Sequence, residues 1–388
     1  MAKTYYALLP SVTGSVEEEF LQILDQILDI SNSGFTPVRI NIFADLPDFA
    51  SLITLRGKIT EICTHDLGPA CPAVSLTAQP PEKPWKTAVE AVFIKTGSAS
   101  VRGGYHNTIP YIVLESSSGR ELLAGGLSSY MHPDDTRAAA EAAFDTVLRV
   151  LEKEKMSADN IVRQWNYIGN ILQMKNDFQN YQIFNEVRSE YYGRYRSLSR
   201  YPAATGVGMN HGGVIIDICA FQPSDFVSLV AVKNPGQVNA YEYGQKVLKG
   251  SAGKGKNIKN PPQFERGLLV SAGDHSVLLI SGTASIIGQE TVGTGDIDKQ
   301  TTVTIENISK LSDPSRIGQL MGYPGEPVKK YGFLRVYVKR QNDFSTVRQK
   351  CKEYFPGVPV SYIGADICRD DLLVEIEGEA ELMFNKKH

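Results

Sequence analysis

The sequence predicts an α+β fold made of three consecutive copies of one strand–helix–strand–strand pattern. Similar segments begin at Val38, Ile161 and Phe333, each with a run that alternates like a strand. An Asp-Phe pair follows in every copy, and a later strand carries one acidic residue among apolar neighbours. Because the same features recur in the same order, we interpret the segments as internal repeats rather than unrelated pieces of an α+β protein.

The Asp-Phe pairs are expected to mark where the helices begin. Their aspartates are Asp48, Asp177 and Asp343. An aspartate at this point accepts hydrogen bonds from the free amides of the first helical turn, and the phenylalanine after it would bury against the sheet. We therefore predict an amphipathic helix after each pair.

A proline and two further strands complete each copy. The prolines are Pro72, Pro202 and Pro359, and each is followed by a short strand-like run. The final strands read VEA, IDI and VEI, with one acid in each. These acids are Glu90, Asp217 and Glu375. The local order is therefore strand, helix, strand, strand.

A second shared segment lies upstream of the second and third copies. It reads as a strand, a Gly-rich turn and a long helix that begins with acidic residues, once from residue 120 and again from residue 275. Acidic side chains at a helix N-terminus bind free amides and complement the helix dipole. The N-terminal counterpart is weaker: YYALLP followed by the helical sequence VEEEFLQILDQILDI.

These repeats divide the chain into four parts. Units of similar size are predicted at 1–100, 101–221 and 268–388, and the first is the most degenerate. Residues 222–267 match no repeat, and long insertions without periodicity are usually functional or disordered. We expect this insertion to act as a lid over a cleft, with a Gly/Lys-rich stretch at 250–260.

Composition and charge narrow the class of protein. The chain has 388 residues, of which 42% are hydrophobic and 21% charged, as in ordinary globular proteins. A net charge of −3 gives no basic surface for nucleic acid, and no apolar run is long enough to cross a membrane. Five spaced cysteines and six scattered histidines show neither a disulfide framework nor metal-ligand spacing. We therefore expect a cytoplasmic protein with reduced thiols, no metal and no nucleic-acid partner.

The third unit resembles the YjgF/RidA fold, a small α+β domain that forms trimers with clefts between its subunits. The likeness rests on SGTASI at 281–286 and RDDLLVEIE at 369–377. Three such units in one chain imply an internal pseudo-trimer, with the active site between the second and third units.

A longer set of segments is similar to the chorismatases of the FkbO type. These segments are RQWNYIGNI at 163–171, YPAATGVG at 201–208, NPGQVNAYEYG at 234–244, PPQFERG at 261–267 and SGTASIIGQET at 281–291. The resemblance implies hydrolysis of the enol ether of chorismate, with release of pyruvate and no cofactor. The second product would be a dihydroxycyclohexadiene carboxylate, or a hydroxybenzoate in another branch.

The implied reaction needs a general acid. An enol ether is cleaved after protonation of its methylene carbon, and a carboxylic acid can donate this proton if burial disfavours its anion. The resemblance places the acid at the glutamate after the SGTAS turn, which is Glu290 here. The alternative for Glu290 is a solvated residue in a Gly-rich loop.

Chorismate carries two carboxylates, so its site needs cationic or amide donors. Arginine is best suited to pairing with carboxylates. Arg266 in PPQFERG matches the family pattern, and Arg163 in the RQWNY strand is a second candidate. Either could instead be a surface arginine.

Four further residues are expected to shape the pocket. By resemblance, Tyr241 and Tyr243 would contact the ring and donate hydrogen bonds, unless they only pack in a half-buried strand. Thr283 and Ala284 belong to the SGTAS turn, whose backbone would form a pocket wall. The hydroxybenzoate-forming branch tends to have Cys where Thr283 stands, which favours simple hydrolysis here.

Three positions depart from the family pattern. Gly236 and Glu242 stand where the family usually has Arg, and Gln289 stands where it usually has His. Each lost charged contact is worth roughly 1.5–3 kcal/mol, or about tenfold in affinity, so another ligand stays open. Lysines of the insertion could replace the missing cations: Lys246, Lys249, Lys254 and Lys256.

Two other functions remain open. One is another YjgF/RidA-like enzyme, for example an enamine or imine hydrolase, which predicts a smaller pocket with a single Arg–carboxylate contact. The other is a binding or scaffold protein without catalysis, which predicts that Glu290 points into solvent with no nearby cation. A fused pseudo-trimer needs no further subunits, so we expect a monomer or a weak dimer.

Overall fold

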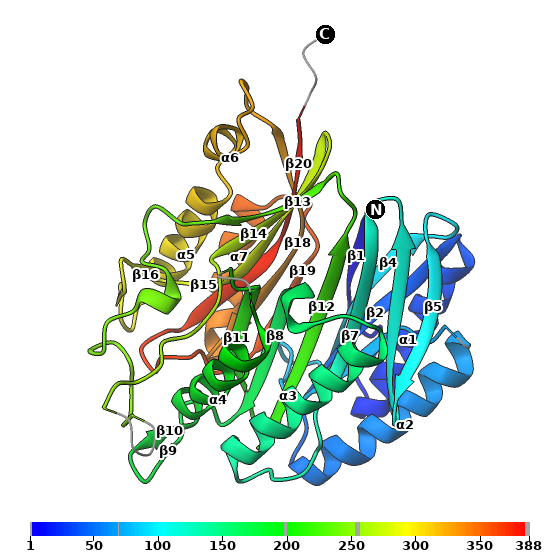
Figure 1. Ribbon diagram of the computed structural model, residues 1–388. Coiled ribbons are helices and arrows are strands. Elements are labelled where there is room, and N and C mark those ends of the chain that lie inside the picture. Colours follow the sequence, from blue (N-terminus) through cyan, green and yellow to red (C-terminus); the bar gives the residue numbers. More distant parts are fainter. Residues whose placement is uncertain (1, 69, 198–199, 253–256, 385–388) are drawn as a thin grey trace.

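The computed structural model is an α+β protein, as the sequence predicts, with strands at the centre and helices on the outside (Figure 1). It describes residues 2–68, 70–197, 200–252 and 257–384. Sheets of four, six and six strands make up most of the fold, and two short two-stranded ribbons complete it. Over these ranges no helix is both long and apolar enough to cross a membrane.

The N-terminal part of the chain forms the four-stranded sheet. In order across the sheet, its strands are β1 (Lys3–Leu8), β4 (Thr87–Lys95), β2 (Phe35–Ala44) and β3 (Ala73–Thr77). The β2–β3 pair is parallel and the other pairs are antiparallel. The parallel pair therefore lies at one edge.

The two six-stranded sheets share one strand order. In order across the sheet, the first has β11 (Ala203–Met209), β8 (Ile161–Gly169), β12 (Val214–Pro223), β7 (Gly119–Leu127), β6 (Ile109–Ser116) and β5 (Ser100–His106). The second has β19 (Val360–Gly364), β18 (Val328–Val338), β20 (Val374–Met383), β15 (His275–Ala284), β14 (Gly267–Ala272) and β13 (Val227–Val232). Each begins with a parallel pair, and its first four strands repeat the arrangement of the four-stranded sheet.

The position of β13 corrects the predicted insertion. Residues 227–232 lie inside the segment 222–267, yet they form the edge strand of a sheet by pairing with β14. The sequence VSLVAV is rich in β-branched residues, which favour a pleated, half-buried surface. Between β13 and β14 the described chain has one short 3-10 helix, Ala240–Glu242, so only this later part is outside the sheet.

Seven α-helices of the described chain flank the sheets. They are α1 (Val16–Asn32), α2 (Phe49–Leu67), α3 (Thr136–Lys153), α4 (Asn180–Tyr195), α5 (Ile297–Leu311), α6 (Pro314–Leu320) and α7 (Phe344–Tyr354). Their apolar faces bury against the strands, as Phe20 of α1, Phe144 of α3 and Ile308 of α5 show. Burial of each such side chain contributes about 1.5–3 kcal/mol.

Aspartates begin most of the predicted helices. Asp48 accepts a hydrogen bond from the Ser51 amide (2.7 Å) and so caps α2. Asp135 and Asp296 cap α3 and α5 in the same way. Asp343 directly precedes α7, although its side chain makes no capping bond.

The predicted helix start at Asp177 is wrong. The short strands β9 (Met174–Lys175) and β10 (Phe178–Gln179) form a hairpin there. Asn176 and Asp177 are its two turn residues, with φ of 51° and 65°. Asn and Asp accept this left-handed conformation more readily than most residues. The helix α4 therefore begins only at Asn180.

The three repeated acids occupy equivalent positions in their sheets. Glu90 on β4, Asp217 on β12 and Glu375 on β20 are all buried. Each acid pairs with a residue of a neighbouring strand, and in all three cases that strand has an arginine two positions before the paired residue. Glu90 is paired with Arg335 (2.7 Å), and Asp217 accepts a hydrogen bond from the Gly126 amide (2.7 Å). Glu375 instead faces a pocket.

Candidate active site

The pocket beside Glu375 lies where the two six-stranded sheets meet. Residues of α4 and β11 form one wall, and residues of β15 and β20 form the other. Residues from 243–249 and 262–266, both in the chain between β13 and β14, complete the lining. The later part of the predicted insertion therefore contributes to this site.

Glu375 is the buried acid of the pocket, with 5% of its surface exposed. Burial raises the pKa of Glu375 to about 8, and the Glu377 carboxylate also raises it, while Arg266 and Arg163 lower it. The carboxyl group is therefore mainly protonated at neutral pH. A neutral carboxylic acid that faces a pocket can serve as a proton donor.

Gly282 allows this carboxyl group to approach the backbone of β15. A Cβ atom at Gly282 would lie 2.0 Å from Glu375 Oε1, so a side chain here would displace the acid. The Gly282 amide donates to Thr205 Oγ1 (3.0 Å), and the Ala204 amide donates to Ser281 Oγ (2.9 Å). The predicted SGTAS turn proves to be the end of strand β15, which includes residues 281–284. These hydrogen bonds hold that end of β15 against β11 and set the position of Glu375.

The guanidinium groups of Arg266 and Arg369 both lie near the ring of Tyr243 in the same pocket. Arg266 is buried, and its Nη2 donates to the Tyr243 hydroxyl (2.6 Å) and to the Val238 carbonyl (2.7 Å). Its Nε has no hydrogen-bond partner within the described residues. Arg369 lies 5.2 Å from the Tyr243 ring and donates to the Gln289 carbonyl (2.8 Å). The pocket therefore holds two positioned cations, which suit a ligand with two carboxylates.

Three of the predicted site residues line the pocket: Arg266, Tyr243 and Ala284. Thr283 is buried beside it, and its hydroxyl donates to the Ser281 carbonyl (2.9 Å). Thr283 therefore supports the turn rather than forming a pocket wall.

Tyr241 and Arg163 lie outside this pocket. The Tyr241 hydroxyl donates to Glu265 (3.5 Å), and its ring does not contribute to the lining. Arg163 is buried, forms an ion pair with Glu377 and donates to Thr205 Oγ1 (2.9 Å). It lines a separate cavity, although its charge still acts on the Glu375 carboxyl group.

Glu290 is exposed, so it lacks the burial that the predicted role of general acid requires. It belongs to the two-residue strand β17 (Glu290–Thr291), which pairs with β16 (Ile286–Ile287). Gly288 between them has φ of 60°, a conformation typical of tight hairpin turns. Glu290 does not line the pocket, and the buried acid beside the SGTAS segment is Glu375.

The three positions that depart from the family pattern do not line the pocket: Gly236, Glu242 and Gln289. Glu242 is exposed and accepts a hydrogen bond from the Asn239 side chain (3.0 Å). The Gln289 side chain accepts one from the Gly244 amide (2.9 Å). These departures therefore leave Arg266 and Arg369 in place.

The lysines expected to compensate differ in position. Lys249 is exposed and lies at the pocket edge, and Lys246 is exposed outside the lining. Lys254 and Lys256 lie outside the described residues. Lys249 is thus a further positive charge near the pocket.

Sequence reasoning missed Glu375 as the buried acid and Arg369 as the second cation. A signal was present, because both belong to the segment RDDLLVEIE and Glu375 is one of the three repeated acids. Their role was hidden because Glu375 meets the SGTAS turn only through the β15–β20 ladder, where it faces Ala284. Neighbours in a ladder are far apart in the chain.

The groups of the pocket define what it can do chemically. A protonated Glu375 can donate a proton, and the two guanidinium groups can pair with anions. Cys368 also lines the pocket, but burial raises the pKa of its thiol to about 12, so the thiol is protonated and a poor nucleophile. Among the described residues, no group of three His, Cys, Asp or Glu side chains could hold a metal ion.

Comparison with known proteins relates these features to a family. The family model described as the N-terminal part of chorismatase FkbO/Hyg5-like proteins matches residues 98–220. A 3-hydroxybenzoate synthase from Streptomyces hygroscopicus is 32% identical over 247 residues, which cover 62% of this chain and 68% of that protein. A chorismatase from Streptomyces rapamycinicus is 33% identical over 224 residues, which cover 56% of this chain and 63% of that protein.

The similarity extends to the fold. A crystal structure of a chorismatase matches with a TM-score of 0.66 at 20% identity, over 98% of this chain and 99% of that chain. Smaller Rid and L-PSP proteins match parts of the chain, with TM-scores of 0.23 and 0.26 in two examples. Fold and site together define an α+β protein with a pocket between two sheets that contains a buried acid and two arginines. Within that class, the chain belongs to the chorismatase FkbO/Hyg5-like family.

Proposed function

We propose that this protein cleaves the enol ether of chorismate and releases pyruvate. The observation that carries the proposal is a buried, protonated Glu375 in one pocket with Arg266 and Arg369. Chorismate offers the matching groups, an enol ether to be protonated and two carboxylates to be bound. The relatives described as a 3-hydroxybenzoate synthase and a chorismatase support this substrate.

In the proposed reaction Glu375 transfers its proton to the methylene carbon of the enolpyruvyl group. The electron pair of the C=C bond forms the new C–H bond, and the carbon bearing the ether oxygen becomes oxocarbenium-like. Water adds to that carbon and returns a proton to the Glu375 carboxylate. As the hemiketal breaks its bond to the ring oxygen, its hydroxyl becomes the keto group of pyruvate and the proton of that hydroxyl passes to the ring oxygen, which leaves as the free ring hydroxyl. A well-placed general acid contributes about 10²–10⁴-fold to such a rate.

Arg266 and Arg369 would hold the two carboxylates of the substrate. Arg266 also acts on Glu375 by charge, because it lowers the pKa that burial raises. The same positive charge would stabilise the Glu375 carboxylate that forms when the proton leaves. Tyr243, whose ring centre lies 5.5 Å from the Arg266 guanidinium and 5.2 Å from that of Arg369, would contact the substrate ring.

The proposed second product is a dihydroxycyclohexadiene carboxylate, formed by simple hydrolysis. By resemblance, Thr283 stands where the hydroxybenzoate-forming branch tends to have Cys. Its hydroxyl is bound to the Ser281 carbonyl and is not turned to the pocket as a nucleophile. A hydroxybenzoate is the alternative product.

We also propose that the chain is a fused pseudo-trimer of YjgF/RidA-like units at about 1–100, 101–221 and 268–388, with β13 joined to the third. The shared strand order of the three sheets supports this, as do the equivalent positions of the three repeated acids. Such a chain needs no partner subunits, so we expect a monomer or weak dimer. With its free cysteines reduced, we expect it in the cytoplasm.

Pyruvate release from chorismate by the purified protein tests the function and the acid together. We expect release by wild type and by Glu290→Gln, and a loss of about 10²-fold or more in Glu375→Gln. Loss in Glu290→Gln with release retained in Glu375→Gln would return the acid to Glu290. If folded wild type releases no pyruvate, the proposed reaction is excluded. The remaining functions would then be an enamine or imine hydrolase, or a binding protein that has lost catalysis, as the exposed Glu290 would suggest.

A further inference from the structure

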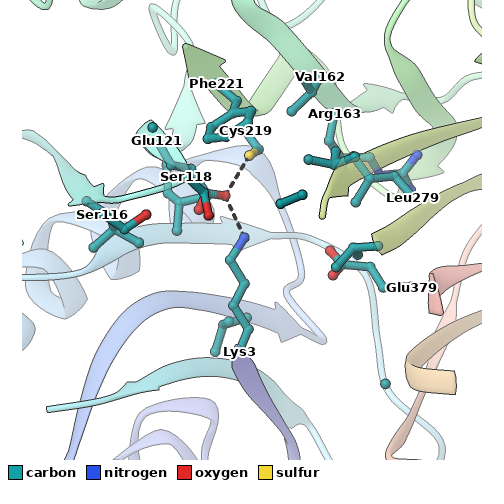
Figure 2. A pocket seen from close by; sticks show the side chains of 18 of the residues that line it. Lys3, Ser116, Ser118, Glu121, Val162, Arg163, Cys219, Phe221, Leu279 and Glu379 are labelled. Carbon is teal, nitrogen blue, oxygen red and sulfur yellow. Dashed lines mark hydrogen bonds and ion pairs between the residues drawn. The ribbon is translucent and has the colours of Figure 1, made fainter. Parts of the chain in front are cut away.

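A second cavity lies where strands of the three larger sheets come together, separate from the Glu375 pocket. Its volume is about 120 Å³, which is room for several water molecules or a small organic molecule. Figure 2 shows Lys3 and Glu121 on one side of the cavity and Arg163 and Glu379 on another. Nothing in the proposed reaction uses this space.

The register of β12 orders the cavity residues from mouth to floor. Gly119, the first residue of β7, pairs with Pro223, the last residue of β12. Gly119 is only half-buried, so we take this end of the cavity as its mouth. Glu121 comes next, two residues further in. On the opposite side of β12, the strand β8 carries Arg163 and Trp165, which pair with β12 still further from its last residue. We call this end of the cavity its floor.

The walls between mouth and floor are mainly apolar, and both Glu121 and Glu379 along them accept a contact from a neighbouring side chain. Lys3 forms an ion pair with Glu121 (2.5 Å), and the Tyr5 hydroxyl donates to Glu379 (2.5 Å). The apolar wall residues include Val162, Phe221, Val270, Val277 and Leu279. An apolar body can therefore lie in the middle of the cavity without facing an unpaired charge of Lys3 or Glu121.

The floor differs, because it holds buried donors without acceptors. Arg163 Nη1 and Arg39 Nη2 have no hydrogen-bond partner in the described chain, and both side chains line the cavity. The Arg39 group has only a 3.7 Å ion-pair contact with Asp217. The two guanidinium groups lie 4.8 and 3.7 Å from the centre of the Trp165 ring. Buried donors without acceptors are costly, and a ligand in the cavity would offer these N–H groups the acceptor that the described chain does not supply.

We propose that this central cavity is a second ligand site, for a small monocarboxylate with a ring-sized apolar body. The carboxylate would accept hydrogen bonds from Arg163 Nη1 and Arg39 Nη2, the geometry for which arginine is best suited. The apolar body would lie against Trp165 and the aliphatic walls, and it would enter past Gly119. This site is independent of the proposed reaction at Glu375.

The floor of the cavity is also connected to the Glu375 pocket. Arg163 donates to Thr205 Oγ1, and the same oxygen accepts a hydrogen bond from the Gly282 amide. A carboxylate bound to Arg163 would thus be two hydrogen bonds away from the SGTAS turn. A ligand in the cavity could therefore change the position of Gly282 beside Glu375. Binding in the cavity does not depend on that change.

A brominated carboxylate provides the test, because bromine quenches tryptophan fluorescence on contact. The chain has two tryptophans, and Trp85→Phe leaves Trp165 on the cavity floor as the single reporter. We expect 4-bromobenzoate to quench Trp165 saturably. Neutral bromobenzene should bind at least about tenfold more weakly, because it lacks the charged contacts.

Two variants separate the cavity from the Glu375 pocket. Val270→Phe fills the cavity from β14 and should weaken 4-bromobenzoate quenching at least tenfold, with Ala272→Leu nearer the mouth as a second variant should the first fail to fold. Arg266→Lys, in the other pocket, should leave the quenching unchanged. The proposal is overturned by an absence of saturable quenching, by equal quenching with bromobenzene, or by quenching that survives a folded cavity-filling variant.

Discussion

Glu375 and Glu377 lie two residues apart on the same face of β20, and both are buried. Their surroundings favour different protonation states, neutral for Glu375 and anionic for Glu377. Burial acts to raise the pKa of Glu377, but ion pairs with Arg335 and Arg163 lower it below its usual value. Burial and the Glu377 charge raise the pKa of Glu375 to about 8. Two like groups on one strand thus become an anion in an ion-pair network and a neutral acid at a pocket.

This relationship predicts how activity depends on pH. Because the proposed general acid Glu375 would act in its protonated form, kcat/KM for chorismate should fall as the pH rises through about 8. Glu377→Gln removes a charge that raises the pKa of Glu375 and frees Arg163, which lowers it, so the fall should move to lower pH. Glu381→Gln, further along β20, is the matched control and should keep the wild-type profile. Identical profiles for wild type and Glu377→Gln would contradict the assignment.

The close approach of Gly282 to Glu375 predicts a strong effect of one methyl group. Gly282→Ala should reduce pyruvate release by about 10²-fold or more, because its Cβ would lie 2.0 Å from Glu375 Oε1 and displace the acid. Overpacking should also cost about 1–3 kcal/mol in stability. In Gly332→Ala the nearest atom to the added Cβ is 3.9 Å away, so this control should keep activity. Equal activity of the two variants in a pyruvate assay would argue against this placement of the acid.

Arg266 and Arg369 are predicted to act mainly in binding. Arg369→Ala should raise KM for chorismate about tenfold or more, since a charged contact is worth roughly 1.5–3 kcal/mol. Arg266→Lys should have a comparable effect, because an ammonium group lacks the fork that reaches both Tyr243 and Val238. Steady-state kinetics would measure both, with the exposed Arg340→Ala as control. An unchanged KM in both pocket variants would place the carboxylates elsewhere.

The protonated state of Glu375 also predicts how stability depends on pH. The pKa of Glu375 is higher in the folded protein, about 8, than its ordinary value of 4.5, so the folded state holds a proton that the unfolded state releases. The contribution of this group to the free energy of unfolding is therefore complete below about pH 4.5 and lost as the pH rises towards 8. Denaturant unfolding at pH 5.5 and pH 8 should show a loss of a few kcal/mol that is absent in Glu375→Gln. A loss of the same size in the variant would mean that Glu375 is not the group responsible.

Much of the order of helices and strands was predictable because it depends on neighbours along the chain, although the strand β13 and the β9–β10 hairpin were missed. The capping role of Asp48 follows from its own position before an amphipathic run. The recurrence of Glu90, Asp217 and Glu375 in equivalent strands was also visible, and all three prove to be buried. The failure at Asp177 has a local cause too, since Asn176 and Asp177 form a hairpin turn before the helix starts.

The sequence by itself determined the class of fold, the repeated elements and the family resemblance, because periodicity, caps and motifs are properties of short segments. Only the tertiary structure decided which acid is buried beside the SGTAS turn, because burial depends on segments that are distant in the chain. Glu290 follows the turn in sequence but is exposed, whereas Glu375 reaches it across a ladder and is buried. Arg163 was assigned to the pocket from its motif, yet its ion pair with Glu377 holds it at the central cavity. Charge and burial arise from packing in three dimensions, and a motif records only the order of its residues.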